Sequence, residues 1–474
     1  MALLVTATLL SGAVRLAVAA DPHSDTFQPD VFGTGAALQR RTPQLTDPLG
    51  RECPPPAGAL SFATAVDIAL CRNPTTRSAW ASARQQAAAL GSAESAWLPN
   101  VSGTGSETRA FGEHVEVTGN LDASVQNSRD AALNLSWTLY DFGARGGRIT
   151  NARRLLDAAA LTVNSVTQQT VLNVVQTYYG LVAADANLEA ANITESDALH
   201  ALEVTRALAQ GGAGSLADVL QAETAYDQAV LARVQAEAAA KIALGTLAVS
   251  LGLPADQSLT LNAEPVPAQV PELTAHMTDL MAEAVRQRPD LAAAEAQREA
   301  AVANVTVARA AGRPSISISA SRNLVDTTGV PNQSYNLIGV NVTVPIFSGF
   351  SVDYGVRQAQ GALEVSEINA ENIRLNVTQS VWSAYYSLAS ANQQIAVTSG
   401  LIKTAEQNEQ VALGRYQGGV GTIIDVLTAQ AAASLARQTR IAAELAWQTA
   451  RAQLAFALGR LSGAEPIADG AALP

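Results

Sequence analysis

The residue types that most often perform chemistry are sparse in this sequence of 474 residues. Its four histidines, His23, His114, His200 and His276, lie far apart, and each is better explained as a surface or structural residue than as a metal ligand. The motifs HExxH, CxxC, GxSxG and the phosphate-loop pattern GxxxxGKS/T do not occur. We therefore predict that the protein is not an enzyme and uses no metal or cofactor.

Two glycine-rich stretches are nearly identical, QGGAGSLADVL at residues 210–220 and QGGVGTIIDVL at residues 417–427. They are not phosphate loops, because the segment before each one reads as helix rather than strand. Glycine ends a helix by adopting the left-handed conformation, and Ser215 or Thr422 can cap the helix that follows. The glycines that predict two tight turns between helices are Gly211, Gly212, Gly214, Gly418, Gly419 and Gly421.

The paired turns belong to a duplication that covers most of the chain. ALCRNP at residues 69–74 matches AVRQRP at residues 284–289, 215 positions later. WTLYDFG at residues 137–143 then matches VPIFSGF at residues 344–350 with a separation of 207, which the turns share. Several landmarks that keep one spacing indicate a repeat rather than chance. The predicted structural repeats are residues 61–272 and 273–474.

The N-terminus reads as an export signal. Residues 1–20 have a short apolar core and small residues at their end, which is typical of a cleaved signal peptide, and they are too short and interrupted for a membrane anchor. A proline-rich segment follows at residues 21–60. Export to the oxidising periplasm makes Cys53 and Cys71 a disulfide candidate, and two buried free thiols are the alternative.

Each repeat contains a segment with a period of two residues. Apolar and polar residues alternate over residues 133–139 and again over residues 338–346, which predicts strands with one apolar and one polar face. The predicted strands lie within residues 99–143 and 313–350, around polar loops near residues 106–130 and 322–336. Two hairpins of this kind cannot bury a face alone.

The remainder of each repeat reads as helix. No proline occurs from Ala144 to Gln210, so one helix of about 100 Å is predicted there. Helical hairpins are expected over residues 144–252 and 351–461. Residues 158–184 carry no charge, but their many Thr, Asn and Gln side chains exclude a transmembrane helix.

Composition narrows the class of protein further. The net charge of −12 argues against a nucleic-acid partner, which needs clustered Lys and Arg. Amphipathic strands span membranes only in closed barrels, and four strands are too few for one chain to close a useful barrel. Two readings remain open: several chains that pool their strands in a membrane, or a soluble periplasmic rod of helical hairpins with a small sheet.

The order and duplication of these motifs resemble the TolC family of outer-membrane factors across essentially the whole mature chain. The resemblance implies a mainly α fold with a small β part, built as a homotrimer. Long helical hairpins would form an α-barrel across the periplasm, continuous with a 12-stranded transmembrane β-barrel to which each chain gives four strands. The implied location is the outer membrane of a Gram-negative bacterium, in contact with its lipid.

The resemblance also assigns roles to residues at the turns. Asp425 matches the family's pore-lining aspartate and Tyr416 its gate tyrosine, while Asp218 is the counterpart of Asp425 in the first repeat. The turns themselves would be periplasmic tips that contact an adaptor protein. From the residues alone, both aspartates are explained by helix capping. Thr428 and Gly421 depart from the family pattern, so a double carboxylate ring and an arginine-locked gate are not expected.

Family members serve as exit ducts with an inner-membrane transporter and a periplasmic adaptor (membrane fusion) protein. The N-terminal segment with its two cysteines, and the lack of a cysteine for lipidation, look more like type I secretion components that use an ABC transporter and export a toxin or another large protein. A drug or small-molecule efflux pump is the alternative, and a soluble helical rod is a remote one.

Overall fold

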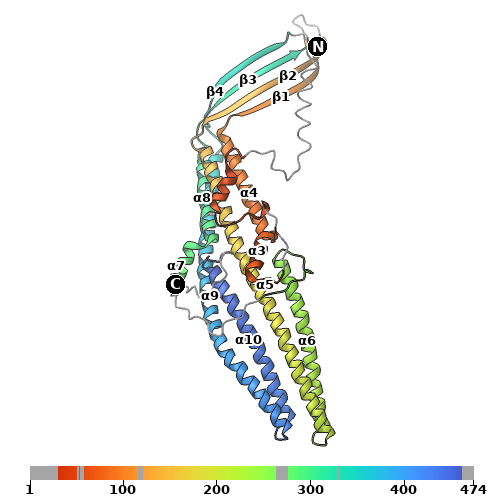
Figure 1. Ribbon diagram of the computed structural model, residues 1–474. Helices are drawn as coiled ribbons and strands as arrows, with labels where there is room; N and C mark the ends of the chain where they lie inside the picture. The colour runs from red at the N-terminus through yellow and green to blue at the C-terminus, as the bar shows by residue number, and fades with distance from the viewer. Residues whose placement is uncertain are drawn as a thin grey trace.

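The computed structural model of the protein describes residues 30–50, 53, 58–115, 121–262, 276–328 and 331–461. The predicted signal peptide and much of the predicted proline-rich segment lie outside the described residues. The molecule is elongated, with a sheet at one end and helices that run from it to two neighbouring turns at the other (Figure 1).

One short helix, α2 (Thr34–Arg41), precedes two sets of elements that follow the same order. The first set comprises α3 (Phe62–Arg72), α4 (Pro74–Glu94), β1 (Asn100–Val115), β2 (Leu121–Tyr140), α5 (Ala144–Gln210) and α6 (Leu216–Ser250). The second set comprises α7 (Met277–Gln287), α8 (Pro289–Ala310), β3 (Ser315–Thr327), β4 (Gln333–Thr343), α9 (Ser351–Gln417) and α10 (Ile423–Ala457). Two 3-10 turns, η2 (Pro48–Gly50) and η3 (Ser95–Trp97), complete the described elements.

The four strands form one antiparallel sheet in the order β1-β2-β3-β4. The central pair, β2 and β3, joins the two repeats in one sheet, with Leu135 opposite Ala320. Strands β1 and β4 each pair with one neighbour in the described structure, so both lateral edges of the sheet carry unpaired backbone groups.

The strands are longer than the sequence pattern indicates. The predicted loop at residues 106–130 is wrong, because β1 continues to Val115 and β2 begins at Leu121. In the second predicted loop, residues 322–327 and 333–336 are strand. Charged and hydroxyl side chains made these stretches read as loops, but they pair across strands, as Arg129 does with Glu107. The predicted strand at residues 344–346 is also wrong, since β4 ends at Thr343.

The long helices follow the prediction closely. Both α5 and α9 have 67 residues, which corresponds to about 100 Å each. At their lower ends they pack with α6 and α10 in the order α6-α5-α10-α9, as Figure 1 shows from right to left. Among the described residues, no helix is both long and apolar enough to be a candidate membrane span.

The end of each hairpin contacts the break between the first two helices of its repeat. The contact is equivalent in the two repeats. Gly252 follows α6 with a φ of 75°, and an added Cβ there would lie 2.8 Å from the carbonyl carbon and oxygen of Arg72. The neighbouring Asn73 Nδ2 donates to the carbonyl of Ser250 at 2.8 Å. In the second repeat, Gly459 has a φ of 74° and a Cβ would lie 3.0 Å from the carbonyl oxygen of Gln287. Glycine is required at both positions because backbone meets backbone.

Candidate functional site

The first turn, between α5 and α6, is built as a helix end followed by a capped helix start. Gly212 has a φ of 76°, in the left-handed region that favours glycine. The hydroxyl of Ser215 accepts from the backbone N–H of Asp218, and the Asp218 carboxylate accepts from the backbone N–H of Ser215. This reciprocal pair is a capping box, which satisfies two otherwise unpaired donors.

The second turn, between α9 and α10, repeats this geometry. Gly419 has a φ of 72°, and Thr422 and Asp425 form the same capping box. The Thr422 hydroxyl also donates to the Asp425 carboxylate at 2.9 Å. Hydrogen bonds from the Thr422 backbone and hydroxyl, and the charge of Arg415, hold the pKa of Asp425 below its usual range. Asp425 is therefore a solvated, firmly ionised carboxylate at the tip.

Tyr416 lies differently from the two aspartates. Its side chain is 7% exposed, in a cluster with Leu202 of α5, Ile423 and Val426 of α10, and its hydroxyl is buried without a hydrogen-bond partner among the described residues. A buried, unpaired hydroxyl costs about 1–3 kcal/mol. The described structure thus brings Tyr416 into an apolar seam between the hairpins and leaves the capping aspartates at the surface.

Sequence reasoning missed a charged cluster about 12 Å above the second turn, at the level of Glu409. Arg437 of α10 lies 3.2 Å from Glu409 and 3.3 Å from Glu406 of α9, and 3.4 Å from Asp197 of α5. Burial and the charge of Asp197 raise the pKa of Glu409 to about 7, against the opposing charge of Arg437. The duplicated sequence held one sign of this cluster. Position 202 of the first repeat, 207 residues before Glu409, is leucine, so the second repeat has a charged residue where the first has an apolar one.

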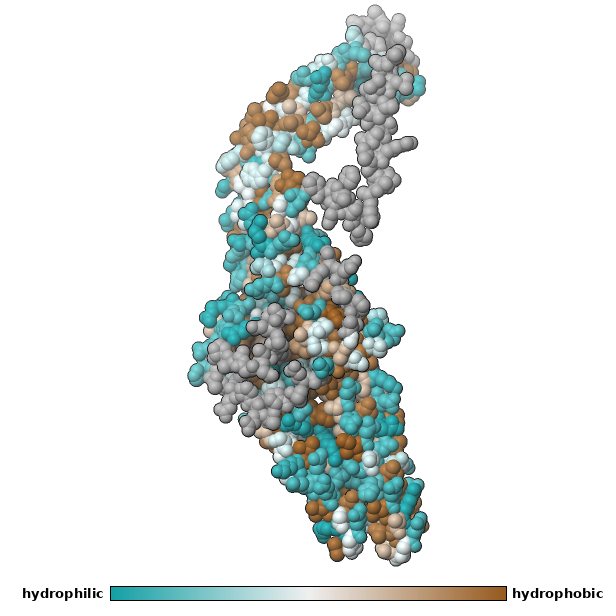
Figure 2. Space-filling model, in the orientation of Figure 1, coloured by the Kyte–Doolittle hydropathy of each residue, from teal (hydrophilic) through white to brown (hydrophobic). Residues whose placement is uncertain are grey.

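The sheet has two chemically distinct faces. Val101, Leu135, Ala320 and Ile338 lie side by side across the four strands in one row. The next row lies on the opposite face and holds Asn100, Ser136, Ser319 and Gly339. Figure 2 shows hydrophobic residues gathered on the part of the sheet next to the helices. The predicted strands with one apolar and one polar face are thus present.

Exposed aromatic residues collect where the sheet meets the helices. Tyr140 packs on Phe142 with ring centroids 4.7 Å apart, and Phe347 packs on Phe350 at 5.5 Å. All four side chains are at least 36% exposed. Aromatic side chains with this exposure are typical of the water–lipid boundary of a membrane.

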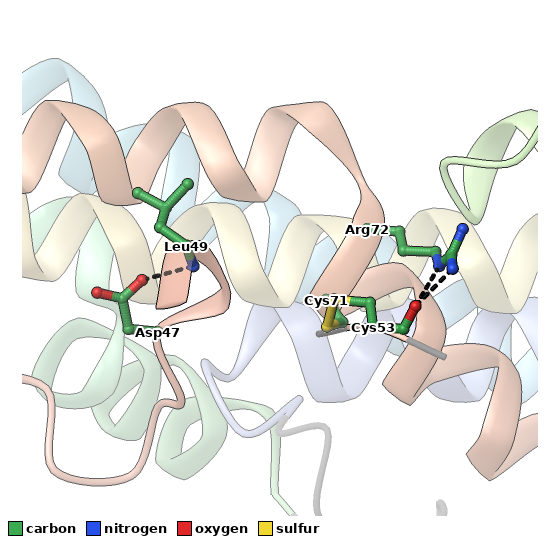
Figure 3. The surroundings of a disulfide bond; sticks show 5 residues. All are labelled: Asp47, Leu49, Cys53, Cys71 and Arg72. Carbon is green, nitrogen blue, oxygen red and sulfur yellow. Dashed lines mark hydrogen bonds between the residues drawn. A yellow bond between two sulfur atoms is a disulfide. The ribbon is translucent and has the colours of Figure 1, made fainter. Parts of the chain in front are cut away.

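The two cysteines lie beside the start of the first repeat. Cys53 and Cys71 form a disulfide with Cα atoms 5.9 Å apart, which attaches the N-terminal segment to the last turn of α3. The guanidinium of Arg72 donates to the carbonyl of Cys53 in the same place (Figure 3).

Comparison with known sequences shows two matching segments. The profile of the family described as Outer membrane efflux protein matches residues 65–253 and 280–460. The chain is similar to protein CyaE of Bordetella pertussis, with 30% identity over 419 residues that cover 86% of each chain. It is also similar to cation efflux system protein CusC of Escherichia coli K12, with 28% identity over 72% of this chain and 76% of CusC.

Solved structures share the fold. The outer-membrane channel OprN is similar with a TM-score of 0.75 and 21% identity, covering 87% of this chain and 95% of that one. The CmeC outer membrane channel of Campylobacter jejuni has a TM-score of 0.73 and 20% identity, covering 86% and 87%. The predicted fold class and the resemblance are confirmed, as is the expectation of a non-enzymatic protein. The chain belongs to the outer membrane efflux protein family, TolC-like channels that lie in the outer membrane of Gram-negative bacteria and extend into the periplasm.

Proposed function

We propose that three copies of the chain close side by side into one channel that conducts cargo from the periplasm through the outer membrane. One observation carries this proposal. The described residues form a layer whose two lateral edges have no partner within that part of the chain, either along the sheet or along the helices. Different edges that fit each other form a heterologous contact, and such contacts close into a ring when the rotation between copies permits.

At the sheet, the free edges are β1 and β4. Pairing β4 of one chain with β1 of the next would satisfy both rows of backbone donors and acceptors. Three chains with four strands each give a barrel of twelve strands. Closure is required in lipid, because an open edge has no water with which to form hydrogen bonds.

At the helices, the outer edges are α6 and α9. Both carry exposed apolar side chains spaced as in a packing face rather than a solvated one. On α6 these are Leu220, Leu231, Ile242 and Val249, and on the part of α9 that lies at the level of α6 they are Val397, Leu401 and Val411. Packing α6 of one chain against α9 of the next would bury both stripes.

The apolar face of the sheet has the height of a bilayer core. The apolar face begins near Phe142. It ends nine residues earlier in the sequence, at Leu133, which lies opposite the charged Arg322. That separation is about 30 Å along a strand. A strand tilt of about 40° reduces the height to about 23 Å, close to the apolar band of about 25 Å on outer-membrane barrels.

The turns would form the periplasmic end of the tunnel, where it narrows and meets an adaptor protein. We place Asp425, Asp218 and Tyr416 at this constriction, and the glycines of both turns at the adaptor contact. The firmly ionised Asp425 supports a ring of three carboxylates. The buried side chain of Tyr416 supports a gate role, because it lies in the seam between the two hairpins at the second turn.

Single-channel conductance in planar bilayers tests the constriction. Asp218→Ala removes one of the two capping-box bonds, so it should weaken the closed state by about 1 kcal/mol and raise conductance. Tyr416→Phe removes a buried hydroxyl that has no partner among the described residues, so it should tighten the seam and lower conductance. Glu237→Ala, on the surface of α6 and far from the turn, is the control. Unchanged conductance in both gate variants would remove these residues from the constriction.

For the cargo, we propose type I secretion of a large protein, together with an inner-membrane ABC transporter and a periplasmic adaptor. The similarity to CusC, a relative named for cation efflux, covers 72% of this chain, whereas the similarity to CyaE, whose name mentions no efflux, covers 86%. The N-terminal segment with its two cysteines points the same way.

A deletion strain separates secretion from efflux. Loss of one large protein from the culture medium, with drug and metal sensitivity unchanged, is the expected result. Increased sensitivity to small toxic compounds with an unchanged set of exported proteins would instead assign the channel to an efflux pump.

A further inference from the structure

The cluster around Arg437 joins the two hairpins of one chain. Asp197 belongs to α5 in the first hairpin, while Glu406, Glu409 and Arg437 belong to α9 and α10 in the second. Neutral hydrogen bonds cross the same seam, since Gln430 Nε2 donates to the carbonyl of Asp197 at 2.9 Å and Thr194 donates to Ser434 at 3.3 Å.

The fold does not require charges at this place. The positions 207 residues before Glu406, Glu409 and Arg437 are Leu199, Leu202 and Val230. Leu202 is 2% exposed and packs with the apolar residues of the same seam. One repeat therefore fills this helix-packing position with leucine, while the other places a glutamate that is 8% exposed.

The charges of the cluster do not balance. Glu409 faces Asp197 from α5, Glu406 from its own helix and Arg437 from α10, which makes three carboxylates around one guanidinium. The side chains of Glu409 and Arg437 are 11% and 12% exposed, so water screens their charges poorly. A proton on Glu409 would remove one excess negative charge and allow the carboxyl group to bond with Asp197.

We propose that Glu409 is a gate residue that latches the first hairpin to the second when its carboxyl group is protonated and loosens them when it is ionised. The proposal rests on the proposed function, because a looser seam about 12 Å above the turns would widen the same constriction. It adds a second, proton-controlled contact to the gate formed at the turns.

The direction of the pH effect follows from linkage. The pKa of Glu409 is raised from 4.5 to about 7 in the packed seam, so the latched state binds more protons than a separated, solvated state between these values. Raising the pH through this window therefore favours separation, by a total factor of about three-hundredfold in the latched-to-separated ratio. The latch is strongest below pH 4.5 and weakest above pH 7.

The distance between the turns reports the latch directly. Spin labels at Ala213 and Val420, both exposed, are introduced into the full-length chain with Cys53 and Cys71 replaced by serine. Labelled chains are diluted with unlabelled ones, so that each assembly holds one labelled copy. We expect the label distance to lengthen as the pH rises from about 4.5 to about 7, and to change little above pH 7.

Three variants make the result specific. Glu409→Gln should hold the short distance at every pH, and Glu409→Leu should do the same with the residue type that the first repeat already accommodates. Glu237→Gln, which alters an exposed pair within α6, should keep the wild-type response. A wild-type distance that ignores pH, or a Glu409→Gln distance that follows the wild type, would overturn the latch.

Conductance of the same proteins separates this proposal from the proposed constriction. Wild-type conductance should rise over the same pH range, and Glu409→Gln should flatten the rise. If the distance responds to pH and the conductance does not, the latch stands and its connection to a constriction at the turns is overturned.

Discussion

At the residue scale, Asp425 has a structural role at its turn and, in our proposal, a second role in the channel. Asp425 completes a capping box with Thr422, which accounts for its place in the sequence without any channel. The same bonds keep it charged, which is what a cation-attracting ring needs. Asp218 shares the cap in the first repeat, so the duplication carried the structural role to both turns.

Exchanging Asp425 for asparagine should separate the two roles. The amide oxygen of asparagine can accept the same hydrogen bonds from Thr422, so the melting temperature of the assembly should change little. Loss of the charge should lower the preference for cations, measured as the reversal potential across a salt gradient. Because the pKa of Asp425 lies below its usual range, the wild-type preference should persist in moderate acid and fall only as the pH drops below about 3.8. An unchanged reversal potential in Asp425→Asn would contradict the ring.

At the element scale, each hairpin is anchored where its last helix ends against a helix break. Gly252 and Gly459 hold these anchors by close approach of backbone to backbone, and both stand directly after a leucine in the duplicated sequence. The rest of the hairpin is held by alanine-rich helix packing, in which small side chains allow close contact over a long distance.

Gly252→Ala should destabilise the first repeat more than Gly212→Ala does. Both substitutions put a side chain at a positive φ, which costs about 1 kcal/mol. At Gly252 the new Cβ would also meet the backbone of Arg72, whereas at Gly212 nothing lies within 4 Å. The urea midpoint of unfolding, followed by circular dichroism, measures the difference. Equal losses for the two variants would contradict the close approach.

Elements with a local sequence pattern could be predicted from the sequence. Features that depend on contacts with another strand or helix could not. Both 67-residue helices follow from the absence of proline in their sequences. The two turns follow from their glycine residues. The ends of β1 and β2 did not, because Glu107 and Arg129 read as loop residues until they pair across strands. The cluster at Glu409 was missed because it exists only when α5 packs on the second hairpin.

At the scale of the whole molecule, the proposed channel requires ring closure through α6 and α9. Ile242→Asp places a charge in the exposed stripe on α6 and should reduce the yield of assembled protein on unheated gels by at least about threefold. Gln221→Asp, exposed on the same helix but outside the stripe, should assemble normally. Equal assembly of the two variants would show that α6 faces solvent in the working protein.

The most direct test of the central claim is the sidedness of the two ends of the molecule. Cys53 and Cys71 are replaced by serine, and single cysteines are placed at Asn332, between β3 and β4, and at Gly212, in the first turn. Cells are treated with a membrane-impermeant maleimide before and after the outer membrane is permeabilised. A channel through the outer membrane predicts labelling at Asn332 on intact cells and at Gly212 only after permeabilisation. Protection of both sites on intact cells, with equal labelling afterwards, would contradict a channel through the outer membrane and favour a rod that lies wholly in the periplasm.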